Sequence, residues 1–180
     1  SKDEILALYE DTRRKCFAAA EDADKRPRIE TLEHVMRPLA PYTPDKVMAE
    51  ATRVPSPEAR LQAFGSEDKL PEKQVPKHLA IQINQALHDL FAKYPETLLF
   101  GEDVAQKGGV YTVTKGLHKA FGNKRVFNTL LDETIILGLA QGYANMGMLP
   151  IPEIQYLAYF HNACDQIRGE AASLQFFSNN

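Results

Sequence analysis

Segments of strand length alternate with segments of helix length from residue 78 onward, and this alternation limits the folds open to the chain. Residues 78–94 place apolar side chains at helical spacing and end before Pro95, and residues 97–100 follow as a short apolar run. The expected order then continues with a helix at 115–121, a strand at 125–129, a helix at 133–146, a strand at 149–154 and a helix at 161–177. This order predicts an α/β fold, in which a parallel sheet carries helices on both faces.

The first part of the chain has a different composition. Eight of the eleven prolines precede residue 77, whereas nine of the ten glycines lie at or after Gly101. Four of these prolines fall within residues 53–77, a charged stretch with few apolar side chains, which we expect to form an extended linker. The expected division is therefore a helical segment at 1–52, the linker, and an α/β domain that starts at residue 78.

Residues 1–52 are expected to contain three helices. Ser1 precedes Glu4 by three residues, which is the spacing of a capping box at the start of a helix. Two shorter helices are expected at 28–36 and 44–52, the last of them starting at a proline.

The composition argues against several classes of protein. A net charge of -3, with Lys and Arg scattered along the chain, offers no basic surface for nucleic acid or a membrane. Cys16 and Cys164 lie far apart and without His or Cys at metal-ligand spacing, so neither a disulfide framework nor a metal site is expected. No apolar run reaches the roughly 20 residues that cross a bilayer. The expected location is a reducing cytoplasm.

Ligands of parallel α/β sheets bind beyond the carboxyl ends of the strands, so residues that follow the expected strands are candidate site residues. This criterion selects Glu102-Asp103, Leu131-Asp132-Glu133 and residues 155–159. Glu133 stands out because it opens a helix that is otherwise almost entirely apolar. Desolvation there is expected to raise the affinity of its carboxylate for a proton, and the helix dipole partly opposes this effect. The alternative is that Glu133 only favours the start of a helix.

Two further patterns have ordinary explanations. Gly108-Gly109 lacks the spacing of a phosphate-binding loop, which favours a plain turn. His161 and Cys164 lie one helical turn apart, but such a pair is more often a packing or surface feature than a nucleophile and its base.

A longer series of motifs carries more information than any of these features. Its members are Leu99-Phe100-Gly101-Glu102-Asp103-Val104, Gly108-Gly109-Val110-Tyr111, Lys115-Gly116-Leu117, Phe121-Gly122, Arg125-Val126-Phe127-Asn128-Thr129, Leu131-Asp132-Glu133, Gly138-Leu139-Ala140-Gln141-Gly142, Pro152-Glu153-Ile154-Gln155, Asp165-Gln166-Ile167 and Glu170-Ala171-Ala172. In order and spacing, the series resembles the beta subunit, or beta-like region, of the E1 component of pyruvate and branched-chain 2-oxoacid dehydrogenases. The resemblance covers residues 78–180.

The resemblance implies that these residues bind thiamine diphosphate through a transketolase-like pyrimidine-binding domain. Glu133 matches the catalytic glutamate that hydrogen-bonds N1' of the aminopyrimidine and favours the imino form, whose nitrogen removes the thiazolium C2 proton. Gln155 and Tyr159 match positions that line the pyrimidine pocket, with the Tyr159 ring stacked on the aminopyrimidine. Leu131 matches a backbone or apolar contact to the same ring.

Other positions are matched less closely. Glu102 and Asp165 match acids that the family buries near the pocket, although a structural hydrogen-bonding role suits them equally well. The chain departs from the family pattern at Asn128, where an acid is usual, at Leu130, where proline is common, and at Asn162, where some members carry another acid. These departures affect the rim of the implied pocket.

Residues 1–52 resemble the C-terminal tail of the E1 alpha chain. The resemblance therefore implies a fused alpha-beta E1, in which residues 53–77 link the tail to the beta-like domain at 78–180. The diphosphate and Mg²⁺ site would lie before residue 1 and the substrate-handling histidines after residue 180, so this stretch alone is expected to be inactive.

The implied activity is oxidative decarboxylation of pyruvate or a branched-chain 2-oxoacid, with acyl transfer to a lipoyl group. The implied partners are a second E1 protomer, in a dimer or an alpha2beta2-like assembly, and the lipoyl acyltransferase E2, with no role for nucleic acid or a membrane. Two alternatives remain open: a transketolase-type carbon transferase, and a non-catalytic assembly module.

Overall fold

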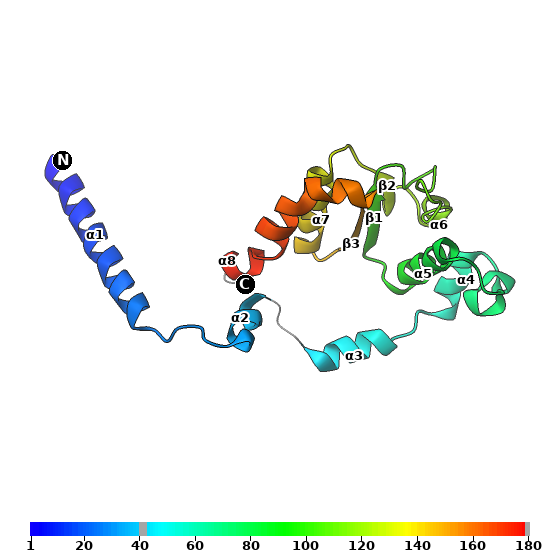
Figure 1. Cartoon of the computed structure of the whole chain (residues 1–180), viewed down its shortest axis with the longest axis horizontal. Helices are drawn as coiled ribbons and strands as arrows, with labels where there is room; N and C mark the ends of the chain where they lie inside the picture. The colour runs from blue at the N-terminus through cyan, green and yellow to red at the C-terminus, as the bar shows by residue number, and fades with distance from the viewer. Residues whose placement is uncertain (40–42, 179–180) are drawn as a thin grey trace. The chain divides into compact units, whose positions relative to one another are not determined.

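The computed structural model describes residues 1–39 and 43–178 (Figure 1). The chain forms two compact units, Ser1–Pro41 and Tyr42–Asn180. None of the helices in the described residues combines the length and the apolar character that crossing a membrane requires.

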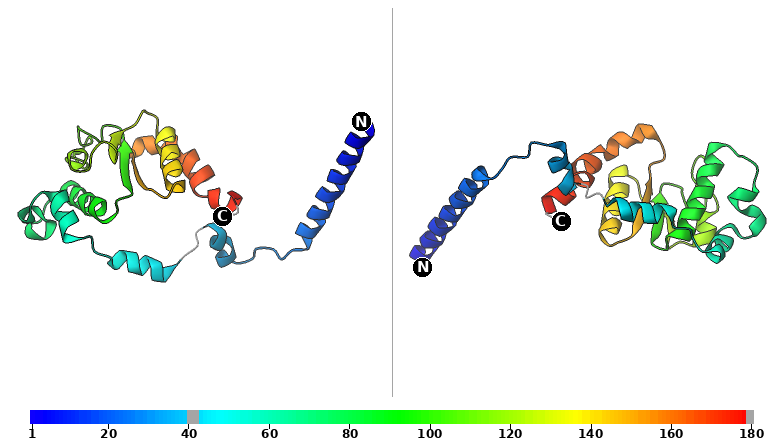
Figure 2. Two further views of the ribbon diagram at one scale, coloured as in Figure 1. Left: turned by 180° about the vertical axis from the view of Figure 1, so that it is seen from behind. Right: turned by 90° about the horizontal axis from the view of Figure 1, so that it is seen from below.

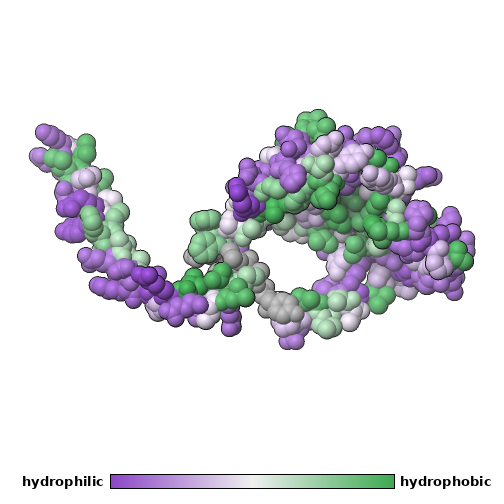
Figure 3. Space-filling model, in the orientation of Figure 1, coloured by the Kyte–Doolittle hydropathy of each residue, from purple (hydrophilic) through white to green (hydrophobic). Residues whose placement is uncertain are grey.

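The first unit contains α1 (Lys2–Lys25) and α2 (Leu32–Leu39). The expected capping box is confirmed, because the Glu4 amide donates to the Ser1 hydroxyl at 3.3 Å and the Glu4 carboxylate accepts from the Ser1 amine. The second helix starts later than expected, after the Thr31 hydroxyl, which accepts from a first-turn amide at 3.2 Å. No side chain of α1 is buried, and Figure 3 shows hydrophobic and hydrophilic atoms exposed side by side along it.

The second unit starts with α3 (Pro44–Thr52), as expected from its proline start. The expectation of an extended linker at 53–77 is wrong. Helix α4 (Pro57–Phe64) lies within it, followed by 3-10 turns at Glu67–Lys69 and Pro71–Lys73. Pro57 starts α4 and Pro71 starts the second 3-10 turn, because a fixed φ suits the first helical turn. The Ser56 hydroxyl caps α4 by accepting from the Ala59 amide at 3.1 Å.

A three-stranded parallel sheet lies at the centre of the second unit. Its strands are β1 (Thr97–Gly101), β2 (Val126–Asn128) and β3 (Leu149–Glu153), in the order β2-β1-β3. The expected α/β class is confirmed. The mostly apolar β1 is buried along its whole length, which is typical of a central parallel strand covered on both faces.

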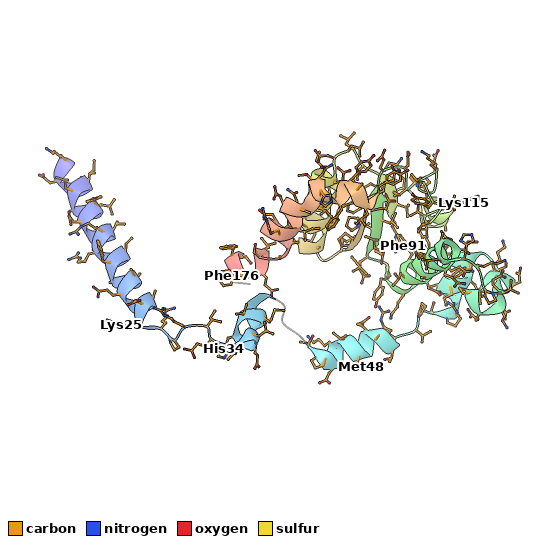
Figure 4. All side chains as sticks on the ribbon, in the orientation of Figure 1. Lys25, His34, Met48, Phe91, Lys115 and Phe176 are labelled. Atoms are coloured by element: carbon orange, nitrogen blue, oxygen red, sulfur yellow. The ribbon has the colours of Figure 1, made fainter. Side chains whose placement is uncertain are left out.

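Helices cover the two faces of the sheet with separate apolar cores. On one face, α5 (Leu79–Lys93) and α6 (Leu117–Phe121) pack against Leu99, and Phe91 marks the place where α5 meets the sheet (Figure 4). On the other face, α7 (Glu133–Asn145) packs against Leu98 and Phe100. Figure 2 shows the strands and α7 from behind and from below. Alternate residues of β1 thus face opposite cores.

The chain after β3 differs from the expected single helix at 161–177. It forms a 3-10 helix at Leu157–Ala163, a π-helical turn at Gln166–Ala171 and the short helix α8 (Leu174–Ser178). Ala163 is the only buried residue of the 3-10 helix among the residues described, and Phe160 one turn earlier is exposed. The 3-10 helix and the π-helical turn both contact α7.

Candidate active site

The register of the sheet places the ends of its three strands at one level. Gly101 pairs with Asn128 on one side and with Glu153 on the other, and these are the last residues of β1, β2 and β3. The residues that follow the strands therefore meet at one edge of the sheet. This edge carries Glu102, the turn that leads to Glu133, and the segment that contains Gln155.

Glu133 is the first residue of α7, and its side chain is buried, with 7% exposed. The preceding Asp132 caps the helix, because its Oδ1 accepts from the Ile135 amide at 3.1 Å. Asp132 therefore performs the helix-starting role, so Glu133 is not needed for it. The Glu133 Oε2 accepts a hydrogen bond from the Asn162 amide nitrogen at 3.2 Å, and no described residue donates to its Oε1.

Gln155 and Tyr159 lie on the segment that leaves β3 and packs against α7. Gln155 is half-buried, whereas Tyr159 is 47% exposed on the 3-10 helix. The Tyr159 and Tyr156 rings pack edge-on, with their centroids 5.6 Å apart. The Tyr156 ring also packs edge-on against the Tyr111 ring, with a centroid distance of 6.1 Å. The 3-10 helix that carries Tyr159 contacts the helix that Glu133 opens, and Gln155 lies between this 3-10 helix and β3. The described hydrogen bonds join Glu133 to Asn162 and not to Gln155 or Tyr159.

The remaining expected residues divide into two groups. Leu131 is 58% exposed in the turn before α7, and Glu102 is partly buried beside the end of β1. The expected burial of Asp165 is wrong, since 83% of its side chain is exposed and it pairs with Arg168 at 2.9 Å. Asp165 stands at the start of the π-helical turn, where a partner three residues later satisfies it in solvent.

Sequence reasoning missed Glu153. Its Oε2 is buried and has no hydrogen-bond partner among the described residues. The side chain lies over Gly101, where a Cβ atom would come within 3.1 Å of that oxygen. Burial raises the pKa of Glu153, and the nearby carboxylates of Glu102 and Asp103 raise it further. An acid inside a strand opposite a glycine was the available signal.

The glycine-containing loop after β1 is a packed turn, as expected. Gly108 has a φ of +83°, and a Cβ atom there would lie 2.7 Å from the Lys115 Cα. The buried Thr114 hydroxyl donates to the Val104 carbonyl at 2.8 Å. Asn128 also supports this loop, since its Oδ1 accepts from the Ala105 amide at 2.9 Å. The Asn128 side chain therefore stabilises the conformation of this loop.

A cavity of about 650 Å³ lies on the β2 side of this edge. His118, Lys124, Phe127 and Tyr143 are among its lining residues, and neither Glu133 nor Tyr159 is. The predicted pyrimidine pocket is therefore a different place from this cavity.

Comparison with known proteins identifies the domain that this edge belongs to. Residues 79–176 match the family described as the transketolase, pyrimidine-binding domain. The chain belongs to this family. The match covers the pyrimidine-binding domain from the start of α5 to α8, and thus includes Glu133, Gln155 and Tyr159.

Relatives of this pyrimidine-binding domain are named as beta subunits of dehydrogenases. The beta subunit of 3-methyl-2-oxobutanoate dehydrogenase from Mycobacterium tuberculosis (strain ATCC 25618 / H37Rv) is 48% identical over 85 residues, covering 47% of this chain and 24% of the relative. The pyruvate dehydrogenase E1 component subunit beta of Staphylococcus epidermidis (strain ATCC 12228 / FDA PCI 1200) is 45% identical over 96 residues, covering 53% of this chain and 30% of the relative. The chain thus spans less than a third of the length of these relatives.

Proposed function

We propose that the pyrimidine-binding domain of this chain supplies the aminopyrimidine half-site of a thiamine-diphosphate-dependent E1 component of a 2-oxoacid dehydrogenase complex. The observation that carries the proposal is the buried Glu133 carboxylate at the edge of the sheet, with one oxygen held by Asn162. Carboxylates are rarely buried without a charged partner, and those that are buried often serve a ligand or a reaction.

The residues at this edge fit the chemistry of an aminopyrimidine. The Glu133 Oε1 has no donor among the described residues, so it can accept a hydrogen bond from a protonated ring nitrogen. Gln155 offers an amide, Tyr159 an aromatic face and Leu131 an apolar surface. When bound, thiamine diphosphate supplies a carbon acid whose deprotonated form attacks the carbonyl carbon of a 2-oxoacid. Glu133 would hold the proton at the ring nitrogen, and Tyr159 would limit the tilt of the ring by stacking.

The remainder of the enzyme forms part of the proposal. The diphosphate and Mg²⁺ would be bound by residues outside this stretch, and the cleft would be completed by a second E1 chain or protomer. The acyl group would pass to a lipoyl group of the acyltransferase E2. Both pyruvate and branched-chain 2-oxoacids are candidate substrates, because relatives named for each are similar to this domain.

We also propose a division of the chain into an alpha-like tail and a beta-like domain. Residues 1–52 would correspond to the E1 alpha tail, and the pyrimidine-binding domain at 78–180 would follow as the beta-like part. Residues 53–77 would connect them as the structured α4 segment rather than as a free linker.

The test replaces Glu133 by Gln in the intact natural protein that contains this sequence. We expect the rate of decarboxylation of pyruvate and of 3-methyl-2-oxobutanoate to fall by about 10²–10⁴-fold, the usual contribution of a positioned acid-base group. The matched control is Glu170→Gln, an exposed acid whose loss should leave the rate unchanged. An unchanged rate in Glu133→Gln would contradict the proposal. Transfer of two-carbon units between sugar phosphates, without decarboxylation, would favour a transketolase-type activity, and inactivity in both assays an assembly module.

A further inference from the structure

Asn162 is the side chain that holds Glu133, and neither the pattern of strand ends nor the matched motifs assign it a role. We propose that Asn162 is a positioning residue that fixes the Glu133 carboxylate for its proton exchange with the cofactor. This inference rests on the proposed function of the domain.

The contact has a defined direction. A carboxylate can only accept, so the amide nitrogen of Asn162 must face it, and this nitrogen lies 3.2 Å from Oε2. A donor to Oε2 stabilises negative charge on Glu133 and leaves Oε1 available to a ligand. Asn162 thereby orients Glu133 so that Oε1 faces the proposed cofactor site, and it restricts rotation of the carboxylate.

The backbone of Asn162 is held by the same helix turn. The Thr134 hydroxyl donates to the Asn162 carbonyl at 3.0 Å. Residues 133 and 134 of α7 therefore hydrogen-bond to the side chain and to the backbone of residue 162. The next residue, Ala163, is fully buried. Two hydrogen bonds, one to its side chain and one to its backbone, and the burial of the next residue therefore hold the exposed Asn162 in place before any ligand binds. A positioning role requires preorganisation of this kind.

The helix type connects Asn162 to the aromatic part of the site. Residues three apart in a 3-10 helix lie on one face, and Tyr156, Tyr159 and Asn162 have this spacing. The Tyr156 and Tyr159 rings contact each other on this face. The Tyr159 ring and the Asn162 donor are therefore presented by the same face of one short helix, and Tyr156 at its N-cap packs on that ring.

Other ionisable groups lie on the elements around Glu133. They lie on the helix cap and α7, on β3, and on the segment packed against α7: Asp132, Tyr143, Glu153, Tyr156, Tyr159, His161, Cys164, Asp165, Arg168 and Glu170. None of them forms a hydrogen bond or an ion pair with Glu133 in the described part of the chain, where Asn162 is the recorded side-chain partner.

The experiment measures deuterium exchange at C2 of thiamine diphosphate bound to the intact natural protein, as a function of pH. Asn162→Leu removes the donor, and Asn162→Asp keeps the shape but adds a negative charge. We expect Asn162→Leu to slow exchange about tenfold, the scale of one hydrogen bond to a charged group. We expect the acidic limb of the profile to move to higher pH in both variants, and further in Asn162→Asp. The KM for the 2-oxoacid should stay within about twofold of the wild-type value, because Asn162 is proposed to act on Glu133 and not to bind the 2-oxoacid.

Two comparisons make the outcome decisive. Asn145→Leu, an exposed site at the other end of α7, should exchange at the wild-type rate. Wild-type profiles in both Asn162 variants would overturn the inference, as would an equal loss of exchange at every pH together with lower thermal stability. Glu133→Gln is measured in parallel: if it exchanges normally, the proposed function itself fails, and if it alone is slow, only the role of Asn162 fails.

Discussion

Two acids at the same edge of the sheet have opposite surroundings. Glu133 is buried but receives a hydrogen bond from Asn162, whereas the buried oxygen of Glu153 has no partner among the described residues. Burial and the neighbouring Glu102 and Asp103 raise the pKa of Glu153, in that order of weight. An ionised Glu153 therefore weakens the folded state, because its charge is desolvated and faces like charges.

Replacing Glu153 by Gln should stabilise the chain at neutral pH by about 1 kcal/mol, because it removes a charge that is desolvated and faces Glu102 and Asp103. The pKa of Glu153 is higher in the folded state than its ordinary value of 4.5. The wild-type chain therefore loses stability as the pH rises above 4.5, whereas the variant has no such group and does not. The difference should vanish at lower pH, where Glu153 is protonated in both states. Thermal unfolding of the full chain at several pH values measures this, with Glu170→Gln as an unchanged control. A Gln variant less stable than wild type at neutral pH would contradict the argument.

At the scale of elements, one arginine explains why residues 53–77 are folded. Arg60 on α4 pairs with Asp89 on α5 at 2.6 Å and with Glu72 on the second 3-10 turn at 2.7 Å. Ala63 on α4 and Leu70 between the two 3-10 turns are buried in the same stretch. The partners of Arg60 lie 12 and 29 residues away, which local composition does not reveal.

This network should make the packing of α4 sensitive to acid. The hydrogen bonds from Arg60 lower the pKa of Glu72 to about 2 from its ordinary value of 4.5. A lowered pKa means that the stabilisation is complete above 4.5 and is lost as pH falls toward about 2. Protection of the α4 amides from hydrogen exchange should decline over this window, and Glu72→Gln should have low protection throughout and little dependence on pH. Equal protection in the variant and the wild-type chain would show that the network is not needed.

At the scale of the whole molecule, the two units differ in how they are stabilised. The second unit has two apolar cores on the faces of its sheet, whereas α1 buries no side chain. Surface ion pairs along α1, such as Lys15 with Asp11 at 2.7 Å, contribute little in water. A helix of this kind is marginal without tertiary contacts.

The full chain should therefore unfold in two stages. We expect the amides of α1 to exchange with solvent at least about 100-fold faster than those of β1, because they open locally rather than with the core. Hydrogen-exchange mass spectrometry on residues 1–180 resolves the two peptides. Similar protection in α1 and β1 would indicate that α1 is packed in solution.

The sequence by itself determined the fold class and the order of the elements, because strand and helix periods are local and strong in residues 78–154. It also selected Glu133, since the position of an acid at the start of an apolar helix is visible in the pattern. The matched series of motifs predicted the pyrimidine-binding family, which the comparison confirms.

Only the tertiary structure decided which residues meet. It showed that Asp165 is exposed, that Glu153 lies over Gly101, and that Asn162 reaches Glu133 across 29 residues of chain. It also replaced the expected helix at 161–177 by 3-10 and π turns. Burial and hydrogen bonding depend on register and packing between distant segments, and these are set by the free energy of the whole domain rather than by any local pattern.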